Sequence, residues 1–401
     1  MVVVGGGISG ASLAYALATE GLGVTVLESS DAYPDRVRGE SMPPWGVREA
    51  RTLGVEDVLL HAGAHISTTW KMYTEGLGET GSLPMDMMIP EISGSLNLRH
   101  PDACQALLDA ATAAGTAVAR GVSGVAITVG AAPTVSYRVD GRTTDLGASL
   151  VVGADGRNST VRKQAGITVE REPPLGYIAG LLLDGLDGVP VDHDVLAGEG
   201  DRFFLLFHQD HGRARAYVCN GLSGKHQFAG SQGTERFLAA WAVTCYPWAE
   251  QVMAATPAGP CAAYPGDDTW IDAPYIDGVI LIGDAAGHND PIIGQGLSLA
   301  MRDARMVRDL VLEGARSASS FADYGRERAA RMQCVRFIAD VMTVVQVEDA
   351  DNRAARRAFI NEKLATMDPA VFPVLLGAFT GPETVPRQLI DEHLLDRIRA
   401  A

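Results

Sequence analysis

The segment Gly5–Gly10, with the sequence G-G-G-I-S-G, constrains the fold more than any other part of the chain. It follows the apolar run 1–4 and precedes the Ala/Leu-rich run 11–20, whose apolar spacing predicts a helix. A second apolar run, 24–27, ends at Glu28. This order of strand, G-x-G-x-x-G, helix, strand and acid predicts a parallel α/β sheet that binds a dinucleotide.

Each part of this fingerprint has a physical task. Gly5 permits the tight turn, Gly7 lets a pyrophosphate approach the backbone, and Gly10 lets the helix pack on the sheet. The helix N-terminus directs free N–H groups at the phosphates. An acid at the end of the second strand suits a free ribose 2′-OH, which favours FAD or NAD over NADP. The expected dinucleotide contacts are Gly5, Gly7, Ile8, Ser9, Gly10 and Glu28.

Two further motifs follow predicted strands. The run 149–153 continues into Asp155-Gly156, and the run 278–282 continues into Gly283-Asp284-Ala285-Ala286-Gly287. Asp284 stands at a strand end, where its carboxylate can accept a hydrogen bond from a ligand hydroxyl. Gly294-Gln295-Gly296 opens a predicted long helix, whose N-terminus supplies N–H donors and positive potential.

Together the three motifs resemble the FAD-dependent aromatic hydroxylases of the para-hydroxybenzoate hydroxylase type, over residues 1 to about 310. They are similar also to flavin halogenases and geranylgeranyl reductases. The segment Arg38-Gly39-Glu40-Ser41-x-Pro43 resembles the R-G-E-x-x-x-P segment of those two branches. The resemblance implies that FAD is the cofactor and that further contacts come from Arg38, Arg99, Asp155, Asp284, Gly294, Gln295 and Gly296.

The resemblance also implies an activity. NADH or NADPH reduces the flavin, O2 adds at C4a, and the C4a-hydroperoxyflavin hydroxylates or epoxidises a small aromatic or polyketide-like substrate. No second G-x-G-x-x-G is flanked by a strand and a helix, so the nicotinamide is expected to dock transiently. Pro291 would line the flavin face. His288 and Asn289 are the catalytic candidates in the same loop, where structural hydrogen bonds explain them equally well.

Three alternatives stay open. A flavin halogenase of the tryptophan type needs a lysine, and Lys71 is present, but the motif W-x-W-x-I-P is absent. A flavin-dependent reductase of the geranylgeranyl type would work without oxygen. A redox-silent FAD-containing cyclase would use the cofactor only as a structural element.

The remaining sequence predicts a β-sheet substrate domain and a helical C-terminal region. Arg213 and Arg215 alternate with small apolar residues in one strand, and either could hold an anionic substrate or lie on an exposed strand face. The C-terminal helices have three open roles: capping the pocket, supporting the flavin domain, or forming a homodimer. The predicted domains are a discontinuous FAD-binding domain (1–65, 96–165 and 271–316), a substrate domain (66–95 and 166–270) and a helical region (317–401).

Composition limits the partners. The net charge of -16 argues against a nucleic-acid partner. The 5 cysteines lack metal-ligand or disulfide spacing, and no apolar run is long enough to span a membrane, so we expect a cytoplasmic protein with no metal. Arginine greatly outnumbers lysine, as is typical of a GC-rich bacterial genome, and we place the chain in bacterial secondary metabolism.

Overall fold

A computed structural model describes residues 1–209 and 212–401. Its first sheet has six strands, and all neighbouring pairs are parallel except the edge pair β21–β22. The strands are short and almost fully buried, as in sheets that are covered on both faces. In spatial order they are β21 (Tyr275–Ile276), β22 (Val279–Leu281), β12 (Val151–Gly153), β1 (Val2–Val4), β2 (Thr25–Leu27) and β8 (Ala117–Ala119). The predicted α/β fold with a Rossmann-like sheet is confirmed.

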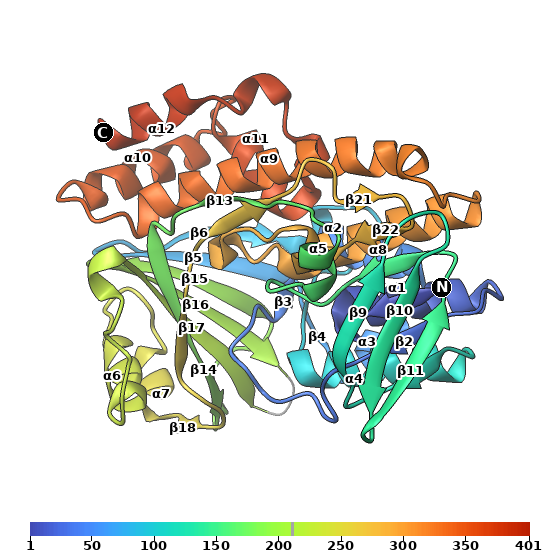
Figure 1. Cartoon of the computed structure of the whole chain (residues 1–401). Helices are drawn as coiled ribbons and strands as arrows, with labels where there is room; N and C mark the ends of the chain where they lie inside the picture. The colour runs from blue at the N-terminus through green and yellow to red at the C-terminus, as the bar shows by residue number, and fades with distance from the viewer. Residues whose placement is uncertain (210–211) are drawn as a thin grey trace.

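Different layers cover the two faces of this sheet (Figure 1). One face carries α1 (Ile8–Thr19), α4 (His100–Ala113) and α8 (Gly296–Leu312). The other face packs against a three-stranded antiparallel sheet of β9 (Ser123–Thr128), β10 (Thr134–Val139) and β11 (Arg142–Gly147). The smaller elements nearby are α2 (Pro44–Leu53), α3 (Glu56–His61), α5 (Thr160–Gln164), β3 (Ser41–Met42), β4 (His65–Ser67) and β7 (Ser95–Asn97).

A second, larger sheet has the order β18-β14-β17-β16-β15-β5-β6, and β19 also pairs with β14. As predicted, the insertion within residues 66–95 contributes two of its strands. The strands are β5 (Thr69–Thr74), β6 (Gly78–Pro84), β14 (Gly176–Asp184), β15 (His193–Glu199), β16 (Arg202–Gln209), β17 (Arg213–Gly221), β18 (Thr256–Pro257) and β19 (Ala262–Pro265). A separate pair joins β13 (Glu170–Glu172) to β20 (Asp268–Trp270). The boundaries of the three predicted domains stay a prediction.

Both faces of the large sheet are buried. Ala214, Ala216 and Val218 on β17 pack toward α6 (Gly233–Ala240) and α7 (Ala249–Ala254). Tyr217 and Cys219 on the same strand belong to the core beneath the C-terminal helices. The predicted alternation is therefore confirmed. The alternative that this face is exposed is wrong at Arg215, which is buried against Asp35 and Glu40, whereas Arg213 stays partly exposed.

Those helices are α9 (Ala322–Gln346), α10 (Arg353–Ala365), α11 (Phe372–Thr380) and α12 (Glu392–Arg399), drawn in orange and red in Figure 1. The last one begins at Glu392, because the Asp391 carboxylate accepts the N–H of His393 and caps the helix there. Pro373 does not interrupt α11, because it lies in the first turn, where proline is tolerated. Within the described residues, no helix combines the length and apolar character needed to cross a membrane.

Candidate functional site

A cavity of about 250 Å³ lies beside the N-termini of α1 and α8. Its lining comes from short segments that are far apart in the sequence and that follow the carboxyl ends of β1, β12 and β22. Ligands of α/β proteins bind at this edge of the sheet. The sequence-predicted residues that line it are Gly7, Ile8, Ser9, Arg38, Asp284, His288, Asn289, Pro291, Gly294 and Gly296.

The glycine fingerprint has the geometry that its spacing predicts. Gly5 has a φ of 103°, and a Cβ atom there would lie 2.3 Å from the Ala154 carbonyl oxygen. A Cβ atom on Gly10 would lie 2.0 Å from the carbonyl oxygen of Gly5. A Cβ atom on Gly7 would meet nothing within 4 Å. Gly5 and Gly10 thus permit close backbone packing, while Gly7 leaves open space on the cavity side.

Glu28 holds the turn of the fingerprint and does not line the cavity. Its side chain is buried, and its two carboxylate oxygens accept the backbone N–H groups of Gly6 at 2.7 Å and Ser30 at 2.8 Å. A carboxylate has about four lone-pair positions, so capacity remains for a further hydroxyl donor. Its contact with a ribose stays a prediction.

In the Arg38–Glu40 segment the backbone and the Glu40 side chain are anchored, whereas the Arg38 side chain has no partner among the described residues. The Tyr217 hydroxyl donates to the Arg38 carbonyl oxygen, and the buried Glu40 carboxylate accepts Arg215 Nε at 2.8 Å and Gln209 Nε2 at 2.7 Å. The Arg38 guanidinium, by contrast, makes no hydrogen bond or ion pair with any residue that the structure describes, and it lines the cavity. An unpaired cation is therefore held at the cavity wall.

Arg213 and Arg215 both have partners within the chain, and their predicted substrate role stays a prediction. Arg215 is fully buried and pairs with Glu40 and with Asp35, the latter at 2.9 Å. Burial alone would lower the pKa of Arg215, but the hydrogen bond and charge of Glu40 raise it. Arg213 pairs with Asp184 at 2.6 Å. Neither residue lines the cavity at α1 and α8.

Two other predicted contacts are also engaged within the chain. The Asp155 carboxylate accepts the N–H groups of Thr160 at 2.6 Å and Val161 at 3.1 Å, which places it at the start of α5. Arg99 pairs with Asp102 at 3.1 Å. Sequence reasoning missed the cavity-lining residues beside them, Arg157 and His100, and their adjacency to the motifs was the available signal. Burial lowers the pKa of His100 to about 4.

The loop around Asp284 is shaped from α8 and α9. Arg328 donates to the carbonyl oxygens of Ala286 at 2.7 Å, Gly287 at 2.9 Å and Gly283 at 3.3 Å. Asp303 accepts Arg328 Nε at 3.0 Å and the N–H of Gly283 at 2.8 Å. The Asp284 carboxylate stays partly exposed in the cavity and accepts Arg157 Nε at 3.4 Å. The C-terminal region therefore supports this loop, which was one of its three open roles.

Burial alone would raise the pKa of Asp303. The adjacent cations Arg328 and Arg331 outweigh that effect and lower its pKa. Asp303 therefore remains a carboxylate that can bind both guanidinium groups and the loop N–H.

His288, Asn289 and Pro291 all lie at the cavity, but the two polar side chains have local partners. His288 Nδ1 lies 2.8 Å from Thr269 Oγ1, and its Nε2 lies 3.3 Å from Asp267 Oδ1. Asn289 Nδ2 donates to the Asp290 carbonyl oxygen at 2.6 Å. Both ring nitrogens of His288 are thus used to hold the loop, and a catalytic role for these residues stays a prediction.

The N-terminus of α8 presents backbone to the cavity. Gly294 has a φ of 66°, in the left-handed region that favours glycine, and a Cβ atom on Gly294 or Gly296 would meet nothing within 4 Å. The Gln295 side chain does not line the cavity. Its Oε1 accepts Trp45 Nε1 at 2.8 Å, and its Nε2 donates to the carbonyl oxygens of Ile293 and Ala378. Any cofactor contact of Gln295 would therefore come from its backbone.

These features fit FAD. Two helix N-termini suit an anionic diphosphate, and the unpaired Arg38 guanidinium adds positive charge. The open backbone at Gly7, Gly294 and Gly296 leaves room for a flat ring system against the chain. The described residues contain no group of His, Cys, Asp and Glu side chains suited to a metal ion.

Comparison with known proteins agrees with this site. The model of a family described as "FAD binding domain" matches residues 1–337. Squalene monooxygenase SE1 of Panax ginseng is 24% identical over 318 residues, which cover 78% of this chain and 58% of that protein. The chain thus spans little more than half the length of this relative.

Solved structures share the fold. P. aeruginosa PqsL, in complex with 2-aminobenzoylacetate, matches with a TM-score of 0.75 and 23% identity over 88% of this chain and 98% of PqsL. CmlS, a flavin-dependent halogenase, matches with a TM-score of 0.76 and 15% identity over 100% of this chain and 76% of CmlS.

Proposed function

The chain belongs to the FAD binding domain family, as its three fingerprints predicted, and from this premise we propose that it is an FAD-dependent monooxygenase. It uses NADH or NADPH and O2 to hydroxylate or epoxidise a small organic substrate. The observation that carries this proposal is the open N-terminus of α8 at Gly294–Gly296, on the wall of the cavity.

In this proposal the chain binds and orients the cofactor. Gly7, the N-terminus of α1 and Arg38 bind the diphosphate. The Asp284 carboxylate accepts a hydrogen bond from a ribityl hydroxyl. Glu28 accepts a ribose hydroxyl. When bound, FAD would supply two-electron redox chemistry and reactivity with O2. The chain's own contribution to that chemistry is electrostatic, because the N-terminus of α8 stabilises negative charge gathered beside it.

A second contribution is the exclusion of water. Pro291 lines the cavity from the turn Pro291–Ile293, and the next residue, Ile292, is buried in the core beneath the C-terminal helices. This apolar wall keeps solvent from the side of the cavity that faces the large sheet. The name of the ginseng relative, a monooxygenase, supports oxygen insertion over the reductase alternative.

Halogenation has less support in the site, although CmlS shares the fold. Lys71, the lysine that this alternative would need, pairs with Glu79 across β5 and β6 at 3.2 Å. It is not among the residues that line the cavity at α1 and α8.

Isotope labelling tests the proposal. With NADH or NADPH, a turned-over substrate and 18O-labelled O2, we expect one labelled oxygen atom in the product and the other in water. Product that forms equally well without O2, or that contains only solvent oxygen, contradicts the monooxygenase and favours the reductase or the redox-silent cyclase. A chloride- or bromide-dependent increase in product mass favours the halogenase.

A further inference from the structure

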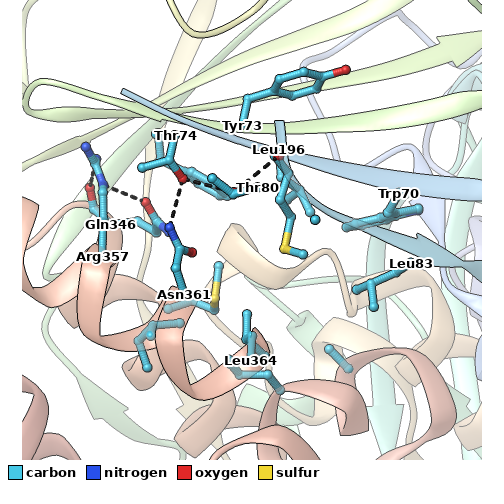
Figure 2. Close-up of a pocket in the computed structure, with 18 of the residues that line it drawn as sticks. Trp70, Tyr73, Thr74, Thr80, Leu83, Leu196, Gln346, Arg357, Asn361 and Leu364 are labelled. Carbon is cyan, nitrogen blue, oxygen red and sulfur yellow. Dashed lines mark hydrogen bonds between the residues drawn. The ribbon is translucent and has the colours of Figure 1, made fainter. Parts of the chain in front are cut away.

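A second cavity, of about 240 Å³, lies between the large sheet and the C-terminal helices (Figure 2). Its floor comes from β5, β6, β15 and β16, and its roof comes from α9, α10 and α11. Most of the lining is aliphatic or aromatic, for example Leu83, Leu196, Phe203, Met342 and Leu364. A cavity of this composition favours an apolar ligand.

One end of this apolar cavity approaches the cofactor cavity. Trp70, Ile292 and Ile293 line the apolar cavity and also a narrow space of about 20 Å³ next to it. That narrow space is lined by Pro291 and Gly294 as well, and both of these residues line the cofactor cavity. The turn Pro291–Ile293 therefore lies between the two cavities, and the narrow space adjoins both of them.

The other end of the apolar cavity is lined by polar side chains and by one cation, Arg357. In Figure 2, Thr74, Thr80 and Asn361 gather at the side away from Trp70 and Leu83. Asn361 Nδ2 donates to Thr74 Oγ1 at 3.1 Å, and Thr74 Oγ1 lies 3.2 Å from Thr80 Oγ1. The Asn361 Oδ1 atom accepts no hydrogen bond from the residues that the structure describes, so it can accept one from a ligand hydroxyl.

The cation at this end is already engaged. Arg357 Nε donates to Gln346 Oε1 at 2.9 Å, and its Nη atoms donate to the carbonyl oxygens of Gly200, Arg202 and Gln346. All three guanidinium nitrogens are thus bound to the sheet and to α9. In Figure 2 the guanidinium points away from the centre of the cavity. The atom that stays free at this end, Asn361 Oδ1, is an acceptor, which a ligand hydroxyl can satisfy and a carboxylate cannot.

From these observations we infer that the apolar cavity binds the substrate, and that the substrate is an elongated, uncharged and largely apolar molecule with a hydroxyl group at its far end. The inference rests on the proposed monooxygenase function. It places the hydroxyl at Asn361 and the reacting carbon beside the turn Pro291–Ile293, next to the cofactor cavity.

Equilibrium dialysis of the FAD-bound protein against 1-hexanol, 1-octanol, 1-decanol and decanoate tests this assignment without turnover. Because each buried CH2 contributes about 0.8 kcal/mol, we expect about 15-fold tighter binding for each two carbons added to the alcohol. We expect 1-decanol to bind more tightly than decanoate. Tighter binding of decanoate would overturn the uncharged end.

Variants locate the binding. Leu364→Trp fills the cavity and should weaken 1-decanol binding at least tenfold, whereas Glu362→Trp, an exposed position on the same helix, should leave it unchanged. Asn361→Leu should remove the advantage of 1-decanol over 1-chlorodecane of the same chain length, and this change puts no bulk into the cavity.

The outcomes separate the two proposals. Alcohol binding that Leu364→Trp leaves unchanged overturns the substrate assignment, even if labelled oxygen enters some other compound. Alcohol binding with the expected variant effects, combined with a product that forms without O2 or contains only solvent oxygen, contradicts the monooxygenase instead.

Discussion

The carboxylate of Glu40 and the guanidinium of Arg215 form an ion pair in which neither side chain is exposed to solvent, although 175 residues separate them. The pair joins the segment that presents Arg38 to the cofactor cavity with the centre of the large sheet. Its strength therefore decides how firmly that segment is held.

Arg215→Met should lower the free energy of unfolding by about 3–5 kcal/mol, because it leaves Glu40 buried and without its cation. Arg213→Met removes a partly exposed pair with Asp184 on the same strand and should cost no more than about 1 kcal/mol. Urea unfolding of both variants checks this, and equal costs would contradict the importance of burial.

Arg38→Met should weaken FAD binding by about 10- to 100-fold, because a charged hydrogen bond to the diphosphate contributes about 1.5–3 kcal/mol. The stability of the apoprotein should not change, since Arg38 has no partner among the described side chains. Titration of apoprotein with FAD measures the effect. Arg36→Met, at a neighbouring exposed position, is the control, and an equal loss there would point to general electrostatics.

Gly296→Val should abolish FAD binding while the apoprotein stays folded. A side chain there meets open space in the chain alone but occupies the space that the flavin requires. Gly296→Ala should have a smaller effect in the same direction. FAD content after purification and the Tm of the apoprotein provide the two readouts, and normal FAD content in Gly296→Val would refute the assigned position of the flavin.

Arg328→Lys should reduce both stability and FAD content, because an ammonium group cannot reach the three carbonyl groups of the 283–287 loop and Asp303 at once. Arg326→Lys, two residues earlier and exposed, should have no effect on either. Thermal unfolding and FAD absorbance distinguish the two variants. Unchanged values in Arg328→Lys would show that the loop holds its shape without this residue.

Asp268 should make stability depend on pH. Burial and the nearby Asp290 raise its pKa from 3.8 to about 8. The folded state therefore keeps a proton that the unfolded chain releases, so this contribution is present at low pH and is lost as pH rises from about 4 to about 8. Asp268→Asn should lose less stability than the wild type between pH 5 and pH 8 in urea unfolding. A parallel pH dependence in both proteins would assign the effect to other groups.

Local sequence rules predicted the cofactor half of the molecule well. Residues 1–28 place strand, turn, helix and acid within a short stretch, and Gly10 packs against the carbonyl oxygen of Gly5 within the same motif. The same holds for the strand before Asp284 and for the start of α8 at Gly296. These features depend on neighbours in the sequence, so spacing alone reveals them.

Sequence spacing could not predict contacts between residues that are far apart in the chain. From its position in an alternating strand, Arg215 is expected to be a surface or substrate-binding residue. Only the fold shows that it pairs with Glu40. Arg328 is one of several arginines in a helical run, and only the packing of α9 on the 283–287 loop distinguishes it. The apolar cavity was equally hidden, because its walls come from strands and helices on opposite sides of one space.

The helix α9 has 25 residues and spans about 37 Å, and its two halves do different work. Arg328 and Arg331, in the first half, hold Asp303 and the loop at Asp284, whereas Met342 and Gln346, in the second half, line the apolar cavity. Substitutions in one half of α9 can therefore be made without altering the contacts of the other half. Directed evolution confined to the second half can alter which compounds the protein accepts, while the first half preserves the cofactor loop that every variant needs.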